Sequence, residues 1–233
     1  MFKDKRIVVT GGAGALGQSV VHYYVERGAR VAIFDYSDEI LDAAFREKDS
    51  NNLYIACDLT DRDSCQSAVQ SVIKGFGGID ILCNIAGGFI MGEDVHETSD
   101  ETWDFLFDLN TRSIMNMVSA VAPVLLDRGG GKIVNIAARA ATAGAAKMGV
   151  YTASKASVMR LTESMALELR GRNINVNCIL PGTIDTPRNR QDMPGADHSK
   201  WVPPAEIARV IGFLTSDEAA AVHGAGIPVD GLS

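Results

Sequence analysis

The sequence lacks the features that mark membrane, secreted and metal-binding proteins. No apolar run approaches the roughly 18 residues of a membrane-spanning helix, and the apolar stretch after residues 1–6 is too short for the core of a signal peptide. The four cysteines have neither paired metal-ligand spacing nor a Cys-x-x-Cys motif, and the four histidines are scattered without a carboxylate at ligand spacing. We therefore expect a protein of the reducing cytoplasm that uses neither a metal nor a membrane.

Positive charge is also in short supply. The chain has 22 Lys and Arg residues against 29 Asp and Glu residues, which gives a net charge of −7 at pH 7. Such a surface repels the phosphates of nucleic acids and the head groups of anionic membranes, so nucleic acid is not expected as a partner. A hydrophobic content of 46% over 233 residues is enough to bury one sizeable core without disulfides. The composition therefore favours an ordinary globular protein.

Short β-branched runs alternate with longer stretches of helical period along the whole chain. The predicted strands span 6–10, 30–34, 53–56, 79–83, 132–137, 173–180 and 225–229. The predicted helices span 16–27, 39–48, 64–76, 100–109, 113–127, 150–170 and 204–215. This alternation is typical of βαβ units, so it predicts a single α/β domain over 1–233, with a doubly wound parallel sheet of seven strands flanked by helices. The one long irregular stretch, 182–202, is predicted to be a substrate loop or lid.

A glycine-rich turn stands between the first predicted strand and the first predicted helix. It reads Thr10-Gly11-Gly12-Ala13-Gly14-Ala15-Leu16-Gly17. Glycines in this place permit a tight turn and let backbone N–H groups approach a pyrophosphate at the N-terminus of the helix. Beyond the second predicted strand comes Asp35, whose carboxylate can accept hydrogen bonds from both adenosine ribose hydroxyls and repels a 2′-phosphate. The pattern predicts a Rossmann-type site for NAD(H), with NADH preferred over NADPH.

Further motifs in the same order give the chain a resemblance to the short-chain dehydrogenase/reductase family. Cys57-Asp58-Leu59 looks like the family's adenine contact, Asn84-Ile85-Ala86-Gly87 like its Asn-Asn-Ala-Gly turn, and Pro181-Gly182-Thr183-Ile184-Asp185-Thr186 like its Pro-Gly segment. Ala15 stands where the family has a glycine, and Ile85 replaces the second Asn of the turn. The resemblance implies that the cofactor is bound by Gly11, Ala13, Gly14, Ala15, Leu16, Asp35, Asp58, Leu59, Asn84, Ala86, Gly87, Tyr151, Lys155, Pro181, Ile184 and Thr186.

Tyr151 and Lys155 are four residues apart, which places them on one face of a predicted helix. A tyrosine titrates near about 10, too high for efficient acid–base chemistry at neutral pH, and a neighbouring ammonium group is expected to lower that pKa. Lys155 can also reach the nicotinamide ribose. In the family that the chain resembles, this pair transfers protons, and an Asn that interrupts a helix holds a relay water. The resemblance therefore implies catalytic roles for Tyr151, Lys155 and Asn110.

The resemblance fails at one catalytic position. The family places a Ser thirteen residues before the Tyr, and here that residue is Ala138. Losing a hydrogen-bond donor to the substrate oxygen can cost on the order of 10²–10³ in rate. Three explanations stay open: a substrate that does not need the donor, such as a quinonoid system; a substitute donor, either Arg139 or Thr142; or a chain that binds cofactor without turnover.

Residues 183–201 resemble the substrate loop of dihydropteridine reductases, NADH-linked family members that also have Ala in place of the Ser, whereas residues 226–231 resemble the usual ending of the wider family. We therefore predict hydride transfer between NAD(H) and a small carbonyl, alcohol or quinonoid, pteridine-like substrate, with Ala138, Arg139 and Arg188 at the substrate. The alternative is a catalytically weak or inactive NAD-binding regulatory or scaffold protein. The substrate's identity and the direction of the reaction stay open.

The two predicted helices at 113–127 and 150–170 carry more apolar surface than one contact with a sheet requires. Members of the family that the chain resembles commonly pair these helices across a two-fold axis. We therefore expect a homodimer or a homotetramer, and the sequence does not distinguish the two.

Overall fold

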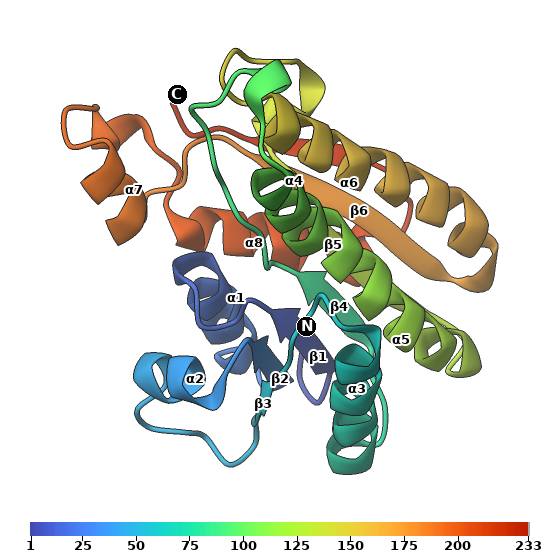
Figure 1. Ribbon diagram of the computed structural model, residues 1–233. Helices are drawn as coiled ribbons and strands as arrows, with labels where there is room; N and C mark the ends of the chain where they lie inside the picture. The colour runs from blue at the N-terminus through green and yellow to red at the C-terminus, as the bar shows by residue number, and fades with distance from the viewer. Residues whose placement is uncertain (233) are drawn as a thin grey trace.

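In a computed structural model that describes residues 1–232, helices cover both faces of a seven-stranded parallel sheet (Figure 1). The strands are β1 (Arg6–Thr10), β2 (Arg30–Asp35), β3 (Leu53–Ala56), β4 (Ile81–Asn84), β5 (Gly131–Ile136), β6 (Ile174–Pro181) and β7 (Gly226–Val229). Their order in the sheet is β3-β2-β1-β4-β5-β6-β7. The predicted fold class, a doubly wound parallel sheet of seven strands flanked by helices, is confirmed.

Eight α-helices are described: α1 (Ala15–Val25), α2 (Asp38–Ala44), α3 (Arg62–Phe76), α4 (Asp100–Phe107), α5 (Ser113–Asp127), α6 (Gly149–Leu169), α7 (Pro187–Asp192) and α8 (Pro204–Leu214). On one face of the sheet, α1 and α8 share a core with Ile7 and Val9. On the other face, α3, α5 and α6 share a core with Val8. Successive strand residues point to opposite faces, so a sheet covered on both sides needs apolar residues in succession. This is why the strands could be found as continuous apolar runs.

The order of the strands reverses at one place in the sheet. From β1 the chain winds outward through β2 to β3, and then returns to pair β4 with the other side of β1. Thr10 of β1 lies opposite Phe34 on one side and Asn84 on the other, at the carboxyl ends of the three strands. Connections leave this point toward opposite faces of the sheet, which opens a crevice where ligands of such folds bind. The topology therefore positions the site described below.

Three segments differ from the prediction. The helix predicted over 39–48 ends at Ala44, because Phe45 leaves the helical region with φ −125°. The helix predicted over 100–109 ends at Phe107, and one π-helical turn over Asp108–Arg112 connects it to α5 where a break was predicted. The segment 182–202 is not irregular throughout, since it contains the short helix α7 and is closed at its base by a bridge between Ile184 and Val202. Its role as a lid stays a prediction.

None of the helices in the described part of the chain is both long and apolar enough to cross a membrane. Over residues 1–232, no group of three or more His, Cys, Asp or Glu side chains is arranged to hold a metal ion. The four cysteines are all free thiols and all buried.

Candidate active site

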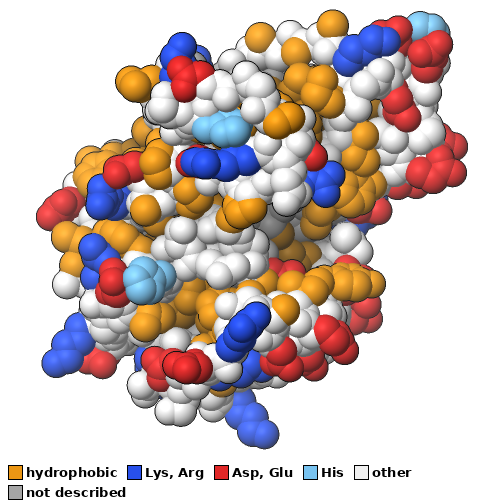
Figure 2. All heavy atoms as spheres, turned by 90° about the vertical axis from the view of Figure 1, so that its left-hand side faces the viewer, with side chains coloured by type: hydrophobic (Ala, Val, Ile, Leu, Met, Phe, Trp, Pro, Cys, Tyr) orange, Lys and Arg blue, Asp and Glu red, His pale blue; other side chains and the backbone are white. Residues whose placement is uncertain are grey.

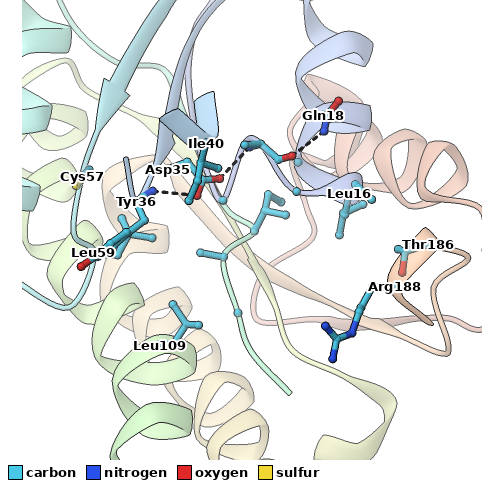
Figure 3. Close-up of a pocket in the computed structure, with 18 of the residues that line it drawn as sticks. Leu16, Gln18, Asp35, Tyr36, Ile40, Cys57, Leu59, Leu109, Thr186 and Arg188 are labelled. Atoms are coloured by element: carbon cyan, nitrogen blue, oxygen red, sulfur yellow. Dashed lines mark hydrogen bonds between the residues drawn. The ribbon is translucent and has the colours of Figure 1, made fainter. Parts of the chain in front are cut away.

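A cavity of about 1050 Å³ opens at the carboxyl ends of β1, β2, β3 and β4. Figure 2 views the molecule from the side of α1, α2 and α7 and shows the surface hollowed there, with hydrophobic side chains beside the hollow. Many residues predicted to contact cofactor or substrate line it: Gly11, Ala13, Gly14, Ala15, Leu16, Asp35, Asp58, Leu59, Ala86, Gly87, Thr186 and Arg188. The cavity also has walls that sequence reasoning missed: Gln18, Tyr36, Ile40 and Leu109 (Figure 3). These four carry no motif that marks them.

The glycine-rich turn forms the floor of the cavity. Gly11 has φ +61°, and a Cβ atom there would lie 2.8 Å from Cα of Ala86. A Cβ on Gly17 would overlap the carbonyl oxygen of Gly11, so both positions require glycine. Gly14 is different, because its φ of −68° suits any residue. Ala15 is the first residue of α1, so the displaced glycine and the alanine of this turn introduce no backbone strain.

The N-terminus of α1 points its backbone N–H groups at the cavity. The first hydrogen bond of the helix runs from N–H of Gln18 to the carbonyl of Gly14, at 2.8 Å. The N–H groups of Ala15, Leu16 and Gly17 therefore precede any helical acceptor, and no side chain caps them. Such an end carries partial positive charge and suits an anion such as a phosphate.

Asp35 stands at one end of the cavity, at the end of β2. Its Oδ2 accepts a hydrogen bond from the backbone N–H of Ala13 at 2.9 Å, and its Oδ1 accepts one from N–H of Tyr36 at 2.9 Å (Figure 3). These bonds fix the carboxylate beside the turn. Asp58 and Leu59, which follow β3, stand on the same side of the cavity.

Asn110 and Lys155 lie together behind the opposite end of the cavity. A Cβ atom on Gly87 would lie 2.9 Å from both Nζ of Lys155 and Oδ1 of Asn110. Both side chains are buried, and Nζ of Lys155 donates a hydrogen bond to the carbonyl of Ile136 at 2.9 Å. Oδ1 of Asn110 accepts one from N–H of Gly88 at 2.8 Å, and Nδ2 donates to the carbonyl of the same residue at 3.0 Å. The π-helical turn holds Asn110 in this place.

Tyr151 is one turn before Lys155 on α6, and its ring meets the ring of Phe89 at right angles with centroids 4.8 Å apart. Burial raises the pKa of Tyr151 to about 12 and lowers the pKa of Lys155 to about 8. The expected net lowering of the pKa of Tyr151 is therefore wrong for this arrangement, because desolvation of the phenolate outweighs the stabilisation expected from Lys155. The structure instead places a phenol with a raised pKa one helical turn from a lysine whose pKa of about 8 is close to neutral pH.

Ser154 connects these residues and was missed by sequence reasoning. Its hydroxyl donates to the carbonyl of Tyr151 at 2.8 Å and accepts from Nδ2 of Asn110 at 3.1 Å. The side chain is fully buried. A serine before the lysine gives no sign, in the sequence alone, of a partner 44 residues away.

The two candidate substitutes for the missing serine each have one partner in the described structure. Ala138 is buried at the end of β5, and Nε of Arg139 forms an ion pair with Oδ1 of Asp230 at 3.1 Å. The hydroxyl of Thr142 donates to the carbonyl of Arg139 at 2.9 Å. The hydroxyl proton of Thr142 is therefore already donated, whereas the ion pair of Arg139 involves Nε and leaves this residue open as a substitute donor.

Five residues predicted to bind the cofactor do not line the cavity: Asn84, Tyr151, Lys155, Pro181 and Ile184. Nδ2 of Asn84 donates to Oδ1 of Asn135 at 2.8 Å inside the sheet, and its own Oδ1 is buried without a hydrogen-bond partner among the described residues. Pro181 ends β6, and Ile184 pairs with Val202 at the base of the loop. Their roles stay predictions.

The chain is similar to proteins of one family over most of its length. The sequence profile described as short chain dehydrogenase matches residues 5–196. An NAD-dependent glycerol dehydrogenase of Listeria innocua is 32% identical, over 98% of this chain and 93% of the relative. A D-threitol dehydrogenase of Mycolicibacterium smegmatis is 35% identical, over 97% of this chain and 92% of the relative.

Solved structures agree with this similarity. The structure of a short-chain type dehydrogenase/reductase from Mycobacterium ulcerans superimposes with a TM-score of 0.93 and 29% sequence identity. The match covers 99% of this chain and 90% of the other. The shared part thus includes the cavity, α6 and the segment 182–202.

Proposed function

Because the chain belongs to the short-chain dehydrogenase family, we propose that it is an NAD(H)-dependent oxidoreductase acting on a small alcohol or carbonyl compound. The observation that carries the proposal is the arrangement at the two ends of one cavity. Asp35 stands at one end beside a helix N-terminus suited to phosphate, and Lys155 and Asn110 meet behind Gly87 at the other. A dinucleotide laid between them would have its reactive ring next to Tyr151. The direction of the reaction is left open.

The bound nicotinamide supplies or accepts a hydride. In the reductive direction, Tyr151 gives its proton to the substrate oxygen, which leaves a buried phenolate. The raised pKa of Tyr151 means that its buried phenolate is energetically unfavourable, so the phenolate needs the positive charge of Lys155 nearby. Lys155 keeps this charge below its pKa of about 8 and is held by the carbonyl of Ile136. Oδ1 of Asn110 holds the backbone N–H of Gly88, and the hydroxyl of Ser154 donates to the backbone carbonyl of Tyr151.

The preference for NAD(H) rests on Asp35. Its carboxylate is fixed in the cavity, where it can accept hydrogen bonds from the free hydroxyls of a ribose, and a 2′-phosphate there would face a like charge. We expect NADH to bind at least about tenfold more tightly than NADPH, since like-charge contacts of this kind cost roughly 1–2 kcal/mol. Calorimetric titration of both cofactors measures the ratio. Asp35→Asn keeps an acceptor for the N–H of Ala13 and is expected to reduce the ratio of NADH affinity to NADPH affinity. The control Asp127→Ala, at an exposed position, is expected to leave that ratio unchanged. Equal affinities in the unmodified protein would overturn the preference.

A second candidate substrate is favoured by Ala138. Without the serine hydroxyl, a developing alkoxide has one donor fewer, whereas a quinonoid or pteridine-like ring spreads the charge through conjugation. The half-exposed ring of Phe89 beside Tyr151 suits a flat ring of this kind. The related glycerol and D-threitol dehydrogenases instead favour a small alcohol.

Ala138→Ser separates the candidates in a panel of polyols, small ketones, quinones and quinonoid pterins with NADH or NAD⁺. For a quinonoid substrate we expect the natural reaction to stay within a few-fold while ketone reduction rises. A rise of about 10² in every reaction would mean that the site had lost activity with the serine. If neither protein turns over any compound, the binding-protein alternative replaces the enzyme.

We also propose that the chain forms a homodimer or homotetramer. Trp103 on α4 and Met115 on α5 are exposed on the described surface, and an apolar side chain of this size is better covered. Light scattering at micromolar concentration tests this, and a monomer would overturn it.

A further inference from the structure

The charges around the cavity are unbalanced for the ligand proposed above. Asp35, Asp58 and Asp108 stand in its wall, and of the described residues that line it, Arg188 carries the only positive charge. Every dinucleotide brings a diphosphate with two negative charges. The turn that receives this group has no Lys or Arg, so its own contribution is limited to N–H groups and the partial charge of α1. A full positive charge near the diphosphate has one source in the wall.

Arg188 is built to face the cavity. Thr186 begins α7 by accepting a hydrogen bond from N–H of Asn189 at 3.1 Å, and Pro187 fills its first turn. One turn later, Oδ2 of Asp192 accepts from Nε of Arg188 at 2.7 Å. This bond uses one side of the guanidinium, and its two terminal amino groups have no hydrogen-bond partner in the described structure. Figure 3 shows them extending from α7 toward the middle of the cavity.

The place of Arg188 along the cavity matches the diphosphate. Asp35 and Tyr36 mark the adenosine end, and Gly87 marks the reactive end. Arg188 lines the same cavity as Leu16 and Gln18 of α1, from the side of α7, so the N–H groups of α1 and the guanidinium bound the space between those ends. A guanidinium fork pairs with two phosphate oxygens at once, which a helix N-terminus alone cannot do.

We propose that Arg188 binds the diphosphate of the nicotinamide cofactor rather than the substrate, and so closes the segment 182–202 over the cofactor. The inference rests on the proposed use of a dinucleotide but not on the choice between NAD(H) and NADP(H), which share the diphosphate. Other positive charges nearby are engaged: Arg190 pairs with both oxygens of Asp185, and Arg112 pairs with Asp108. Neither of these arginines lines the cavity, so Arg188 is the one placed to meet the diphosphate.

The test is calorimetric titration of the whole protein with three ligands: adenosine, ADP-ribose and NADH. Arg188→Gln is expected to weaken ADP-ribose and NADH about tenfold at low salt and to leave adenosine unchanged, since a charge-assisted hydrogen bond is lost at an exposed site. Arg188→Lys keeps part of the affinity, because the charge remains and the fork is lost. Raising the salt concentration to about 1 M shrinks the gap between the protein and Arg188→Gln, because such salt screens exposed charges beyond about 3 Å.

Arg209→Gln is the matched control, because Arg209 lies on α8 in the same kind of exposed pair, with Glu206, away from the cavity. It should leave all three affinities unchanged. If Arg188→Gln leaves ADP-ribose and NADH unchanged and raises only the KM of the substrate, Arg188 serves the substrate and the proposal is overturned. A parallel loss of adenosine affinity would also overturn it, because the effect would then be damage to the fold of the site. If the unmodified protein binds ADP-ribose but not NADH, the proposed function fails while this test still stands.

Discussion

The two edges of the sheet treat ionisable side chains in opposite ways. At the amino edge, Oδ2 of Asp80 accepts from the backbone N–H and the Nε of Arg6, both at 2.8 Å. Its Oδ1 accepts from Arg6 at 2.9 Å and from Arg128 at 3.0 Å. At the carboxyl edge, Lys155 is more deeply buried, with a side-chain hydrogen bond to one carbonyl and no carboxylate partner among the described residues.

The pKa values record this difference. Burial alone would raise the pKa of Asp80, but the hydrogen bonds and charges of Arg6 and Arg128 outweigh it and the pKa is lowered. Burial lowers the pKa of Lys155 and raises that of Tyr151 with no compensating partner. A satisfied charge stabilises the fold, whereas an unsatisfied one is available for proton transfer and costs stability. The stabilising charges around Asp80 and the groups available for proton transfer, Tyr151 and Lys155, therefore lie at opposite ends of the strands.

The largest expected effect is on the turnover rate, when Tyr151 at the carboxyl edge is changed. Tyr151→Phe removes the proton donor, and we expect the turnover rate to fall about 10³-fold, since a positioned general acid contributes roughly 10²–10⁴. NADH affinity and the unfolding temperature should change little, because the ring and its contact with Phe89 remain. Steady-state rates, calorimetric titration and thermal unfolding measure the three quantities. Tyr54→Phe in β3 serves as the control, and a variant of Tyr151 with more than a tenth of the activity would rule out its assigned role.

The next largest effect is on stability, when Asp80 at the amino edge is changed. Asp80→Asn replaces an acceptor of both arginines with an amide, and we expect the free energy of unfolding to fall by about 2 kcal/mol while the rate per folded molecule stays unchanged. Because the folded pKa of Asp80 lies below its unfolded value, its stabilisation is present above about pH 4 and is lost as the pH falls through the folded pKa. Denaturant unfolding from pH 7 down to pH 3 should show the two curves converging. Parallel curves would contradict this account.

The smallest expected change is in the free energy of unfolding when the buried charge of Lys155 is removed. Lys155→Met is expected to be inactive but more stable by about 1 kcal/mol at pH 7, since a buried ammonium is replaced by an apolar side chain of similar length. The folded pKa of about 8 lies below the unfolded value of about 10.4, so the native lysine loses its proton first and the unmodified protein gains stability as the pH rises between them. The advantage of Met should therefore disappear by about pH 10. Denaturant unfolding at pH 7 and pH 10 checks it, and a less stable variant at pH 7 would contradict it.

Much of this was predictable because it depends on local sequence. The strands of a doubly covered sheet are continuous apolar runs, and the glycine at 17 is dictated by contacts within its own turn. The positions of Asp35, Tyr151 and Lys155 followed from their spacing to these elements. These features need no knowledge of distant partners.

The remaining features depend on contacts between segments far apart in the sequence. The pairing of Arg139 with Asp230 and of Ser154 with Asn110 joins residues that no local pattern connects. The raised pKa of Tyr151 depends on how completely the surrounding chain excludes water, which the Tyr-x-x-x-Lys spacing does not record. The short helix α7 was missed because Pro187 and the charges around it are also typical of an irregular loop.

The π-helical turn at Asp108–Arg112 has a consequence for how the gene can change. Such a turn holds one residue more than the α-helix it interrupts, and each residue advances an α-helix by about 100°. Deleting any one residue here would therefore rotate α5 against α4, and the core side chains Met117, Val121 and Leu125 would turn away from the sheet. This segment therefore does not tolerate the insertions and deletions that loops tolerate. A one-residue deletion that converted the π-helical turn to regular α-helix would displace Asn110 and remove side chains from the core together.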